Sequence, residues 1–420
     1  MTNSKHVPKR RFKEFESNGE WELLTLSDIS EGFEYGLNVP AKEFDGVNKY
    51  LRITDIDDTS REFLISNLSS PDANCESLSN YLLAEGDILF ARTGASTGKT
   101  YYYKETDGKV FFAGFLIRAR VKGNFDHRFV FQNTLTKKYK NYIELTSQRS
   151  GQPGVNAQEY SRFSLNIPSL SEQKVIGDFV EKLDSLISKH QHKLDKLKDL
   201  KKAYLTEMFP AEGERVPKRR FPGFEGEWEQ KRLTTIASMH ARIGWQNLRT
   251  SEFLNDGDYY LITGTDFLDG RINFENCYYV DKERYQQDKN IQVKSGSILI
   301  TKDGTIGKVA IVSHLDKPAT LNAGVFNVVI KESNVDEKYL YQYLASPFLM
   351  DYVSKRVTGG TIKHLNQGIL VDFPINIPVY EEQKAIGRFF EHLDQSITLQ
   401  QQKLDKLNDL KKAYLNELFV

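Results

Sequence analysis

Two segments of the chain carry apolar or aromatic residues at alternating steps of four and three. This is heptad spacing, which predicts a long helix that buries one stripe of side chains against another helix. We therefore expect the two helices to pair with each other as a coiled coil. The predicted seam consists of Ile176, Val180, Leu183, Ile187, Leu194, Leu197, Tyr204 and Met208 in the first helix, and Ile386, Phe390, Leu393, Ile397, Leu404, Leu407, Tyr414 and Leu418 in the second.

Polar residues interrupt both seams at matching places, with His190 opposite Gln400 in the alignment and Lys201 opposite Lys411. Polar seam residues can fix the register and the partner of a coiled coil at a cost in stability. Alternatively, the long lysine side chains simply extend past the seam into solvent. The spacing alone leaves both interpretations open, and it does not give the relative direction of the helices.

The heptad segments belong to a repeat of half the chain. Residues 163–209 and 373–419 are identical at 29 of 47 positions, at a constant offset of 210. The sequence GDIL at Gly86 returns as GSIL at Gly296, and the opening VPKRRF at Val7 returns at Val216. The chain is therefore two tandem copies of one design, each with a variable part and a nearly constant C-terminal segment.

The variable parts have mixed periodicity. Residues 110–121 end in a strand-like alternation, with Ile117, Ala119 and Val121 on one face, whereas residues 125–145 have helical spacing. We expect an α+β fold with two tandem mixed α/β domains, each followed by a long helix, and an internal pseudo-twofold repeat. The predicted boundaries are 1–167 and 211–377 for the domains, and 168–210 and 378–420 for the helical segments.

Composition narrows the class of protein. Lys plus Arg and Asp plus Glu both number 57, so the chain is not a uniformly basic nucleic-acid wrapper. Residues 88–165 carry 13 basic and 5 acidic side chains, although residues 298–375 carry 8 and 7. The first copy thus has a basic half-domain that either faces DNA or is an ordinary solvated surface. The absence of a signal peptide, a transmembrane stretch and a cysteine framework predicts a cytoplasmic protein.

Glycine loops follow corresponding strands in both copies. GASTGKT at Gly94 has three residues between its glycines and GTIGKV at Gly304 has two, so neither has the spacing of a P-loop. A second pair of polar loops, QRSGQPGVN and TGGTIKHLN, begins at Gln148 and Thr358. Such loops can contact a phosphate or a base edge, or can be plain turns. Arg52 can contact DNA or pair with Asp55 or Asp57. The candidate nucleic-acid contacts are Arg52, Arg92, Thr93, Lys99, Arg149, Gln152, Lys302, Thr305, Lys308, Lys363 and His364.

Sets of residues with catalytic spacing are missing from the sequence. There is no aromatic-terminated motif of an adenine methyltransferase, no GxGxxG and no GxSxG, and the eight histidines are scattered without metal-ligand spacing. We therefore expect no catalytic residue, no metal site and no cofactor in this chain.

Taken together, the repeated features resemble the specificity subunits of type I restriction-modification systems. The resemblance covers essentially the whole chain and is carried by the VPKRRF opening, the GDIL/GSIL strands, the NIP…EQK…IG segments and the KLDKL…DLKKAYL helices. It implies that each variable domain recognises one half of a split double-stranded DNA site. It also implies an antiparallel coiled coil that sets the half-site spacing and docks two modification (methyltransferase) subunits.

The same resemblance assigns the chemistry to partners. Restriction (motor-nuclease) subunits would join the complex, and S-adenosylmethionine, ATP and Mg would bind to partner subunits and not to this chain. Two other classes remain as alternatives. A coiled-coil scaffold that binds proteins would show no salt-dependent affinity for DNA, and a nuclease or methyltransferase acting alone would need a metal or S-adenosylmethionine site.

Overall fold

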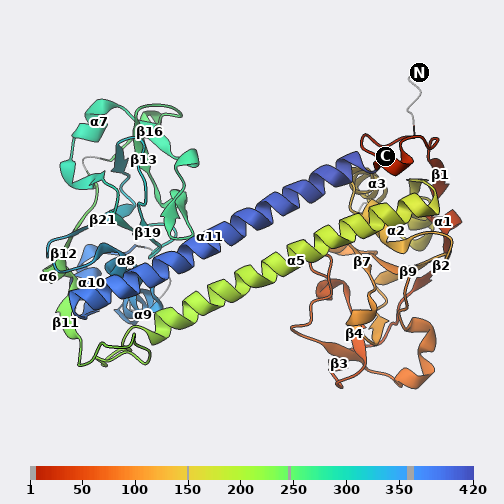
Figure 1. The fold of residues 1–420 in the computed structure, drawn as a ribbon, viewed down its shortest axis with the longest axis horizontal. Helices are drawn as coiled ribbons and strands as arrows, with labels where there is room; N and C mark the ends of the chain where they lie inside the picture. The colour runs from red at the N-terminus through yellow and green to blue at the C-terminus, as the bar shows by residue number, and fades with distance from the viewer. Residues whose placement is uncertain (1–5, 149–150, 245–246, 357–363) are drawn as a thin grey trace. The chain divides into compact units, whose positions relative to one another are not determined.

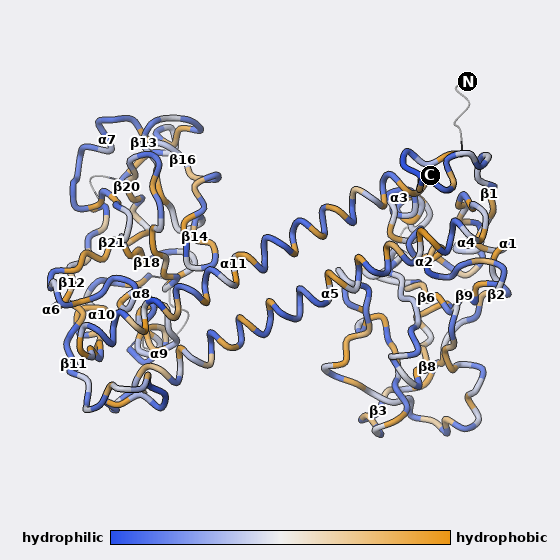
Figure 2. The backbone as a smooth tube through the Cα atoms, in the orientation of Figure 1, coloured by the Kyte–Doolittle hydropathy of each residue, from blue (hydrophilic) through white to orange (hydrophobic). Residues whose placement is uncertain are grey.

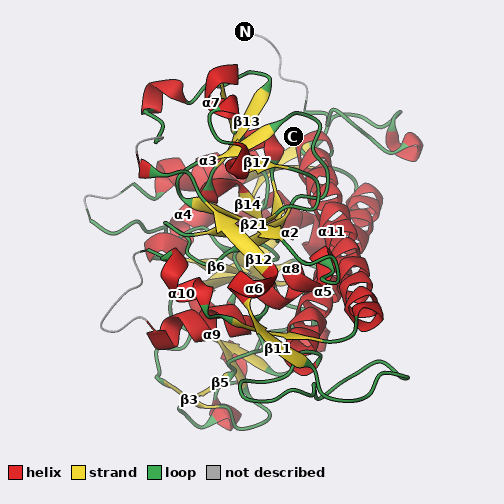
Figure 3. Ribbon diagram, turned by 90° about the vertical axis from the view of Figure 1, so that its left-hand side faces the viewer, coloured by secondary structure: helices red, strands yellow, loops and turns green. Residues whose placement is uncertain are grey.

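The computed structural model describes residues 6–148, 151–244, 247–356 and 364–420. The chain folds into two compact units, Met1–His192 with Gln401–Val420, and Lys193–Gln400. Each unit contains one globular α+β part and portions of two 38-residue helices, α5 (Leu170–Glu207) and α11 (Tyr380–Glu417) (Figure 1). Within the described residues, strands occur only in the globular parts (Figure 3). The predicted fold class is confirmed.

The first unit is built around an antiparallel sheet with the strand order β2-β9-β6-β7. Strands β1 and β10 pair antiparallel beside it, β3 pairs with β5, and β4 pairs parallel with β8. The elements are β1 (Glu22–Thr25), α1 (Leu26–Ile29), β2 (Ser30–Tyr35), β3 (Ala41–Glu43), β4 (Lys49–Leu51), β5 (Ser69–Pro71), β6 (Asp87–Ala91), β7 (Thr100–Tyr102), β8 (Val110–Phe112), β9 (Leu116–Val121), α2 (His127–Asn133), α3 (Lys137–Thr146), α4 (Ala157–Ser161) and β10 (Ser164–Ile167).

The second unit repeats this plan with the sheet β12-β21-β18-β19, and adds the mixed sheet β16-β13-β20-β17. Strands β11 and β22 pair as β1 and β10 do. The elements are β11 (Glu229–Arg232), α6 (Leu233–Ile236), β12 (Ala237–His240), β13 (Tyr259–Ile262), β14 (Phe267–Leu268), β15 (Arg271–Ile272), β16 (Tyr278–Val280), α7 (Lys282–Gln286), β17 (Gln292–Val293), β18 (Ile298–Thr301), β19 (Val309–Ile311), β20 (Ala319–Leu321), β21 (Val325–Ile330), α8 (Glu337–Ala345), α9 (Pro347–Arg356), α10 (Gln367–Val371) and β22 (Pro374–Ile377).

Residues 110–121, which have strand-like alternation, and residues 125–145, which have helical spacing, each form two elements in the structure. Residues 110–121 form two strands, β8 and β9, because a turn at residues 113–115 sends β8 to pair with β4 and β9 to pair with β6. The predicted inward face of β9 does lie in a hydrophobic core. Residues 125–145 contain two helices, because Thr136 caps a new helix by accepting a hydrogen bond from the Tyr139 backbone N–H.

Within each unit, α5 and α11 pack antiparallel. In the first unit, Phe179 near the start of α5 contacts Tyr414 near the end of α11, with ring centroids 4.7 Å apart. In the second unit, Tyr204 near the end of α5 contacts Phe389 near the start of α11, at 5.1 Å. Polar and apolar residues alternate along both helices (Figure 2). The direction of pairing, which the spacing left open, is therefore antiparallel.

Every residue of the two predicted seams is buried or half-buried. The seam lysines end on carboxylates, since Lys201 Nζ lies 2.6 Å from Asp394 and Lys411 Nζ lies 2.6 Å from Asp184. These are equivalent ion pairs in the two units, offset by 210 in both partners. The lysines therefore do more than extend past the seam into solvent, because each one fixes the register of one helix against the other.

Residues of the constant segments anchor each long helix to its own globular part. The Gln173 side chain donates to Pro168 O at 2.8 Å and accepts from the Asp126 backbone N–H at 3.0 Å, and Gln383 makes the equivalent bonds in the second unit. A Cβ atom on Gly177 would lie 2.8 Å from Asp126 Oδ1, and one on Gly387 would lie 2.9 Å from Asp336 Oδ1. The glycines are therefore required by the close approach of α5 to α2 and of α11 to α8.

The basic VPKRRF segments serve the same anchoring. Arg11 pairs with Glu172 at 2.7 Å, and both side chains are nearly buried. Its counterpart Arg220 pairs with Glu382 at the same distance. Because Glu172 and Glu382 are the glutamates of the EQK segments, the two repeated motifs are the two sides of one contact. These arginines hold the helix to its domain and are not open to a ligand.

The glycine contact generates a prediction for stability. Gly177→Ala should lower the free energy of unfolding by about 1–3 kcal/mol because of the steric clash, although alanine in an unconstrained helix would raise it by about 1 kcal/mol. Gly368→Ala in α10 is the matched control, since no heavy atom lies within 4 Å of its Cβ position. Urea unfolding followed by circular dichroism should show a lower free energy of unfolding for Gly177→Ala and a higher one for Gly368→Ala. Equal shifts would mean that close packing does not select glycine at position 177.

Candidate nucleic-acid interface

The glycine loops lie where the sequence predicts them, directly after the equivalent central strands β6 and β18. Gly94 and Gly98 have φ values of 72° and 85°, and Gly304 and Gly307 have 72° and 76°. This left-handed conformation favours glycine and turns the chain sharply. A strand follows each loop, β7 or β19, whereas a P-loop leads into a helix. The spacing argument against nucleotide binding therefore agrees with the local structure.

The structure joins each glycine loop to the second polar loop of its unit. In the first unit, Thr93 forms a β-bridge with Gly154, and the Val155 N–H donates to Arg92 O at 2.9 Å. In the second, Asp303 bridges His364, and the Leu365 N–H donates to Lys302 O at 2.8 Å. Two loops that the sequence treats as separate candidates thus form one continuous surface in each unit.

In the first unit, this surface centres on Arg92. Its guanidinium carbon lies 5.0 Å from the ring centroid of Tyr35 and 5.8 Å from that of Phe115. Thr93 is half-buried beside it, and Gln152 is exposed with its amide next to Gly94. Donor groups and aromatic rings are therefore gathered on one exposed patch.

The equivalent surface of the second unit has different chemistry. Lys302 Nζ lies 5.6 Å from the ring centroid of Phe326, and the exposed His364 side chain contacts Asp303 at 2.5 Å. Thr305 and Lys308 are exposed on the same loop. A cavity of about 360 Å³ opens between Lys302, His364 and the end of β12. The two units therefore present different arrangements of donors and acceptors at matching places.

Two candidates lie away from these patches. Lys99 is only 8% exposed, and its Nζ contacts Ile56 O at 3.1 Å and Asp58 at 2.5 Å. Arg52 forms a two-bond ion pair with Asp55, at 2.8 and 2.9 Å, which raises the pKa of Arg52. The ion-pair alternative for Arg52 therefore matches the structure. Candidates Arg149 and Lys363 lie outside the described residues.

Sequence reasoning missed three residues of these surfaces. Tyr35 and Phe115 flank Arg92 although they come from β2 and from the turn before β9. Their rings are 43% and 56% exposed, which the alternation of the strands does not reveal. Asp303 could have been found from the repeat, because it stands 210 positions after Thr93.

The basic half-domain of the first copy contributes to a groove of about 890 Å³. Lys99, Lys137 and Lys140 line it together with Arg61 and Lys412. The positions equivalent to Lys137 and Lys140 are Pro347 and Met350, so the second unit does not repeat this charge. The excess of basic residues in residues 88–165 therefore contributes to a local basic groove between the glycine loop, α3 and the last turns of α11.

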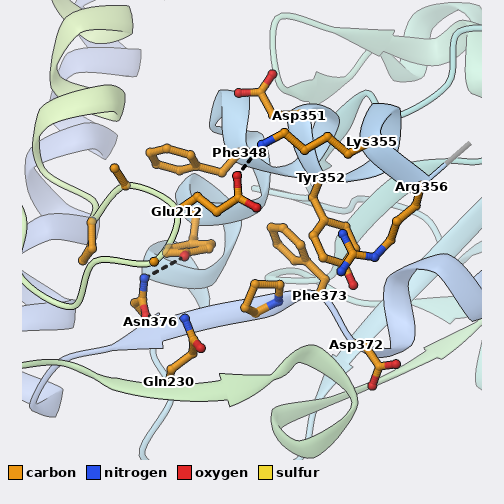
Figure 4. Close-up of a pocket in the computed structure, with 15 residues that line it drawn as sticks. Glu212, Gln230, Phe348, Asp351, Tyr352, Lys355, Arg356, Asp372, Phe373 and Asn376 are labelled. Carbon is orange, nitrogen blue, oxygen red and sulfur yellow. Dashed lines mark hydrogen bonds and ion pairs between the residues drawn. The ribbon is translucent and has the colours of Figure 1, made fainter.

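A further cavity of about 350 Å³ lies in the second unit, where the chain leaving α5 meets α9 and β22 (Figure 4). Its charged groups contact neighbouring side chains, since Lys355 pairs with Glu212 and the Arg356 guanidinium carbon lies 3.5 Å from the ring centroid of Tyr352. None of the candidate residues that the structure describes lines this cavity. The cavity lies at the junction between α5 and the globular part of the second unit.

The described residues lack a metal cluster and a membrane-spanning helix. They contain no group of three or more His, Cys, Asp or Glu side chains placed to hold a metal ion. In residues 6–148, 151–244, 247–356 and 364–420, no helix combines the length and the apolar character that membrane crossing requires.

The two glycine-loop lysines are expected to differ in role. Lys99→Met should lower the free energy of unfolding by about 1–3 kcal/mol, because buried carbonyl groups lose their donor. Lys308→Met should leave stability within about 0.5 kcal/mol and should reduce the salt dependence of DNA binding by about 0.9 in log–log slope. Urea unfolding and fluorescence anisotropy at several KCl concentrations measure these effects. A stability loss confined to Lys308→Met would contradict the assignment.

Comparison with known proteins gives concordant matches. A family model described as the type I restriction modification DNA specificity domain matches residues 18–199 and again residues 225–409. The type I restriction enzyme MjaVIII specificity subunit of Methanocaldococcus jannaschii is 22% identical over 411 residues, which cover 95% of this chain and 92% of that protein. The type I restriction enzyme EcoBI specificity subunit of Escherichia coli is 22% identical over 273 residues, covering 61% and 57%.

Solved structures agree with the fold. The crystal structure of a type I restriction-modification S subunit from M. genitalium has a TM-score of 0.66 at 13% identity, covering 99% of both chains. A chain from a study of complex assembly and conformational transition of the type I system has a TM-score of 0.50 at 16% identity, covering 94% of this chain and 96% of that one. Because the two family matches together span most of its length, the chain belongs to the type I restriction-modification specificity family and is a non-catalytic DNA specificity subunit.

Proposed function

We propose that the two globular parts, residues 1–167 and 211–377, are target recognition domains that each read one half of a bipartite DNA site. The observation that carries this proposal is the pair of equivalent loop surfaces with unequal chemistry, Arg92 with Thr93 in one unit and Lys302 with Asp303 in the other. Equivalent placement suits two half-sites, and unequal side chains make the site asymmetric. Base-edge recognition depends on such differences in donors and acceptors.

The helical segments, residues 168–210 and 378–420, are proposed to set the distance between the half-sites and to dock two modification subunits. Each helix continues for 38 residues, or about 57 Å at the usual rise per residue. The constant segments offer two equivalent surfaces, which suits two copies of one partner. Leu200 and Leu410 stand at equivalent positions outside the seams and are both 43% exposed.

The reactions are assigned to partner subunits. Modification subunits would bind S-adenosylmethionine and methylate adenine, and restriction subunits would use ATP and Mg for translocation and cleavage. The complex would act on double-stranded DNA in the cytoplasm. The recognition chain supplies positioning and specificity, for which surface loops on a rigid scaffold are suited.

A long-read methylome tests this function directly. Cells that express the chain with its cognate modification subunit should gain a split motif with adenine methylated in each half, relative to cells that express the modification subunit alone. Exchange of residues 22–165 for the first domain of another family member should change only one half of that motif. A change in both halves, or no new methylation by an assembled complex, would contradict two-domain recognition.

The spacer role predicts the effect of opening the seam. Leu194 and Leu404 are 1% and 4% exposed, so Leu194→Asp with Leu404→Asp should bury two uncompensated charges and separate the helices. Assembly with the modification subunit should be lost while the recognition domains stay folded, as measured by size-exclusion chromatography and circular dichroism. Thr206→Asp with Asn416→Asp is the matched control, because both residues are exposed at equivalent positions on the same helices. If the seam variant still assembled, the helix pair would not be the docking element.

A further inference from the structure

Arg92 of the first recognition domain is held by two aromatic rings and by its own backbone hydrogen bonds. Its guanidinium lies between the rings of Tyr35 and Phe115, at 5.0 and 5.8 Å from their centroids. Its backbone N–H donates to Phe115 O at 3.0 Å, and its carbonyl accepts from Val155 at 2.9 Å. Tyr35 is fixed in turn, since its hydroxyl accepts from the Ala157 N–H at 3.2 Å. These contacts therefore limit where the guanidinium lies before any ligand arrives.

The same guanidinium has no acceptor among the residues that the structure describes. Among the described residues, no carboxylate pairs with Arg92, and its buried Nε has no hydrogen-bond partner. Arginines on the adjacent strand β9 differ, because Arg118 pairs with Glu34 and Arg120 pairs with Asp87 at 2.7 Å. A desolvated donor without an acceptor is costly in a folded protein. A ligand can supply acceptors to the terminal nitrogens of this half-buried side chain.

The geometry selects the kind of acceptor. A guanidinium fork matches two acceptors in its own plane, and guanine presents O6 and N7 in this way in the major groove. A phosphate can also accept two bonds from the fork, so the groups around Arg92 decide between the two acceptors. The flanking rings and the exposed amide of Gln152 beside Gly94 therefore favour a base edge over the backbone.

The second recognition domain does not repeat this arrangement. The position equivalent to Arg92 is Lys302, which carries a single ammonium group near Phe326. The next residue is Asp303, an acceptor engaged with His364. The bidentate donor therefore belongs to the first domain only, and its base preference should be confined to one half-site.

We propose that Arg92 reads a guanine through O6 and N7 in the half-site of the first recognition domain. This inference rests on the proposed two-domain recognition of DNA. Tyr35 and Phe115 act as positioning residues, because they hold the guanidinium and need not touch the base themselves.

The test uses the assembled complex with its modification subunit. Arg92→Lys keeps the charge and loses the bidentate fork, and Arg162→Lys is the matched control at an exposed arginine of the same domain. The methylome of Arg92→Lys should show one relaxed guanine position in the half-motif that the exchange of residues 22–165 assigns to the first domain. Replacement of that guanine by 7-deazaguanine in a duplex should weaken wild-type binding about 10- to 100-fold and affect Arg92→Lys much less.

Each alternative result is distinct. Weaker methylation with unchanged base preference would identify a phosphate contact and overturn the guanine assignment. Unchanged methylation, with thermal unfolding equal to that of wild type, would overturn it as well. A half-motif without a G·C pair would overturn the assignment while leaving two-domain recognition intact. Absence of any split motif in the wild-type complex would overturn the proposed function and this inference with it.

Discussion

The apolar stripes of α5 and α11 are buried against each other and against the globular cores, and the rest of the structure depends on this packing. Each compact unit includes a portion of both helices, so the first unit combines the start and the end of the chain, while the second is the segment Lys193–Gln400. The ends of the helices also complete the globular cores. Phe419 stacks on Phe129 at 5.2 Å in the first unit, and Phe209 contacts Tyr343 at 5.1 Å in the second. The residues that follow each long helix therefore belong to a globular core, whereas the middle of the seam, at Leu194 and Leu404, buries one helix against the other.

The positions that are identical in the two copies include residues that stabilise the fold. Among the residues that recur without change, Arg11, Glu172, Gln173 and Gly177 lie where a helix meets its globular part. The residues that differ between copies include those of the loop surfaces after β6 and β18. The proposed docking of equivalent partners and the proposed reading of unequal half-sites fit a chain that keeps the first set and varies the second.

Basic side chains that form ion pairs within the protein do not mark a surface for nucleic acid. Arg10, Arg11, Arg118 and Arg120 all form ion pairs within the first unit, so the basic opening and the basic strand are structural. The equal totals of acidic and basic residues likewise conceal local differences, such as the basic groove of the first unit. A nucleic-acid surface is therefore indicated by the few cations that have no internal acceptor, and not by the density of Lys and Arg along the sequence.

The sequence by itself determined the two long helices, their pairing, the two tandem α+β domains and the family, because periodicity and repetition are local or one-dimensional signals. It also located the glycine loops, since a left-handed turn constrains residue type at single positions. Only the tertiary structure decided the antiparallel direction, the joining of two loops into one surface, and the burial of Lys99 while Lys308 stays exposed. These features depend on contacts between residues far apart in the chain, and no pattern within one segment records which distant side chain will face it.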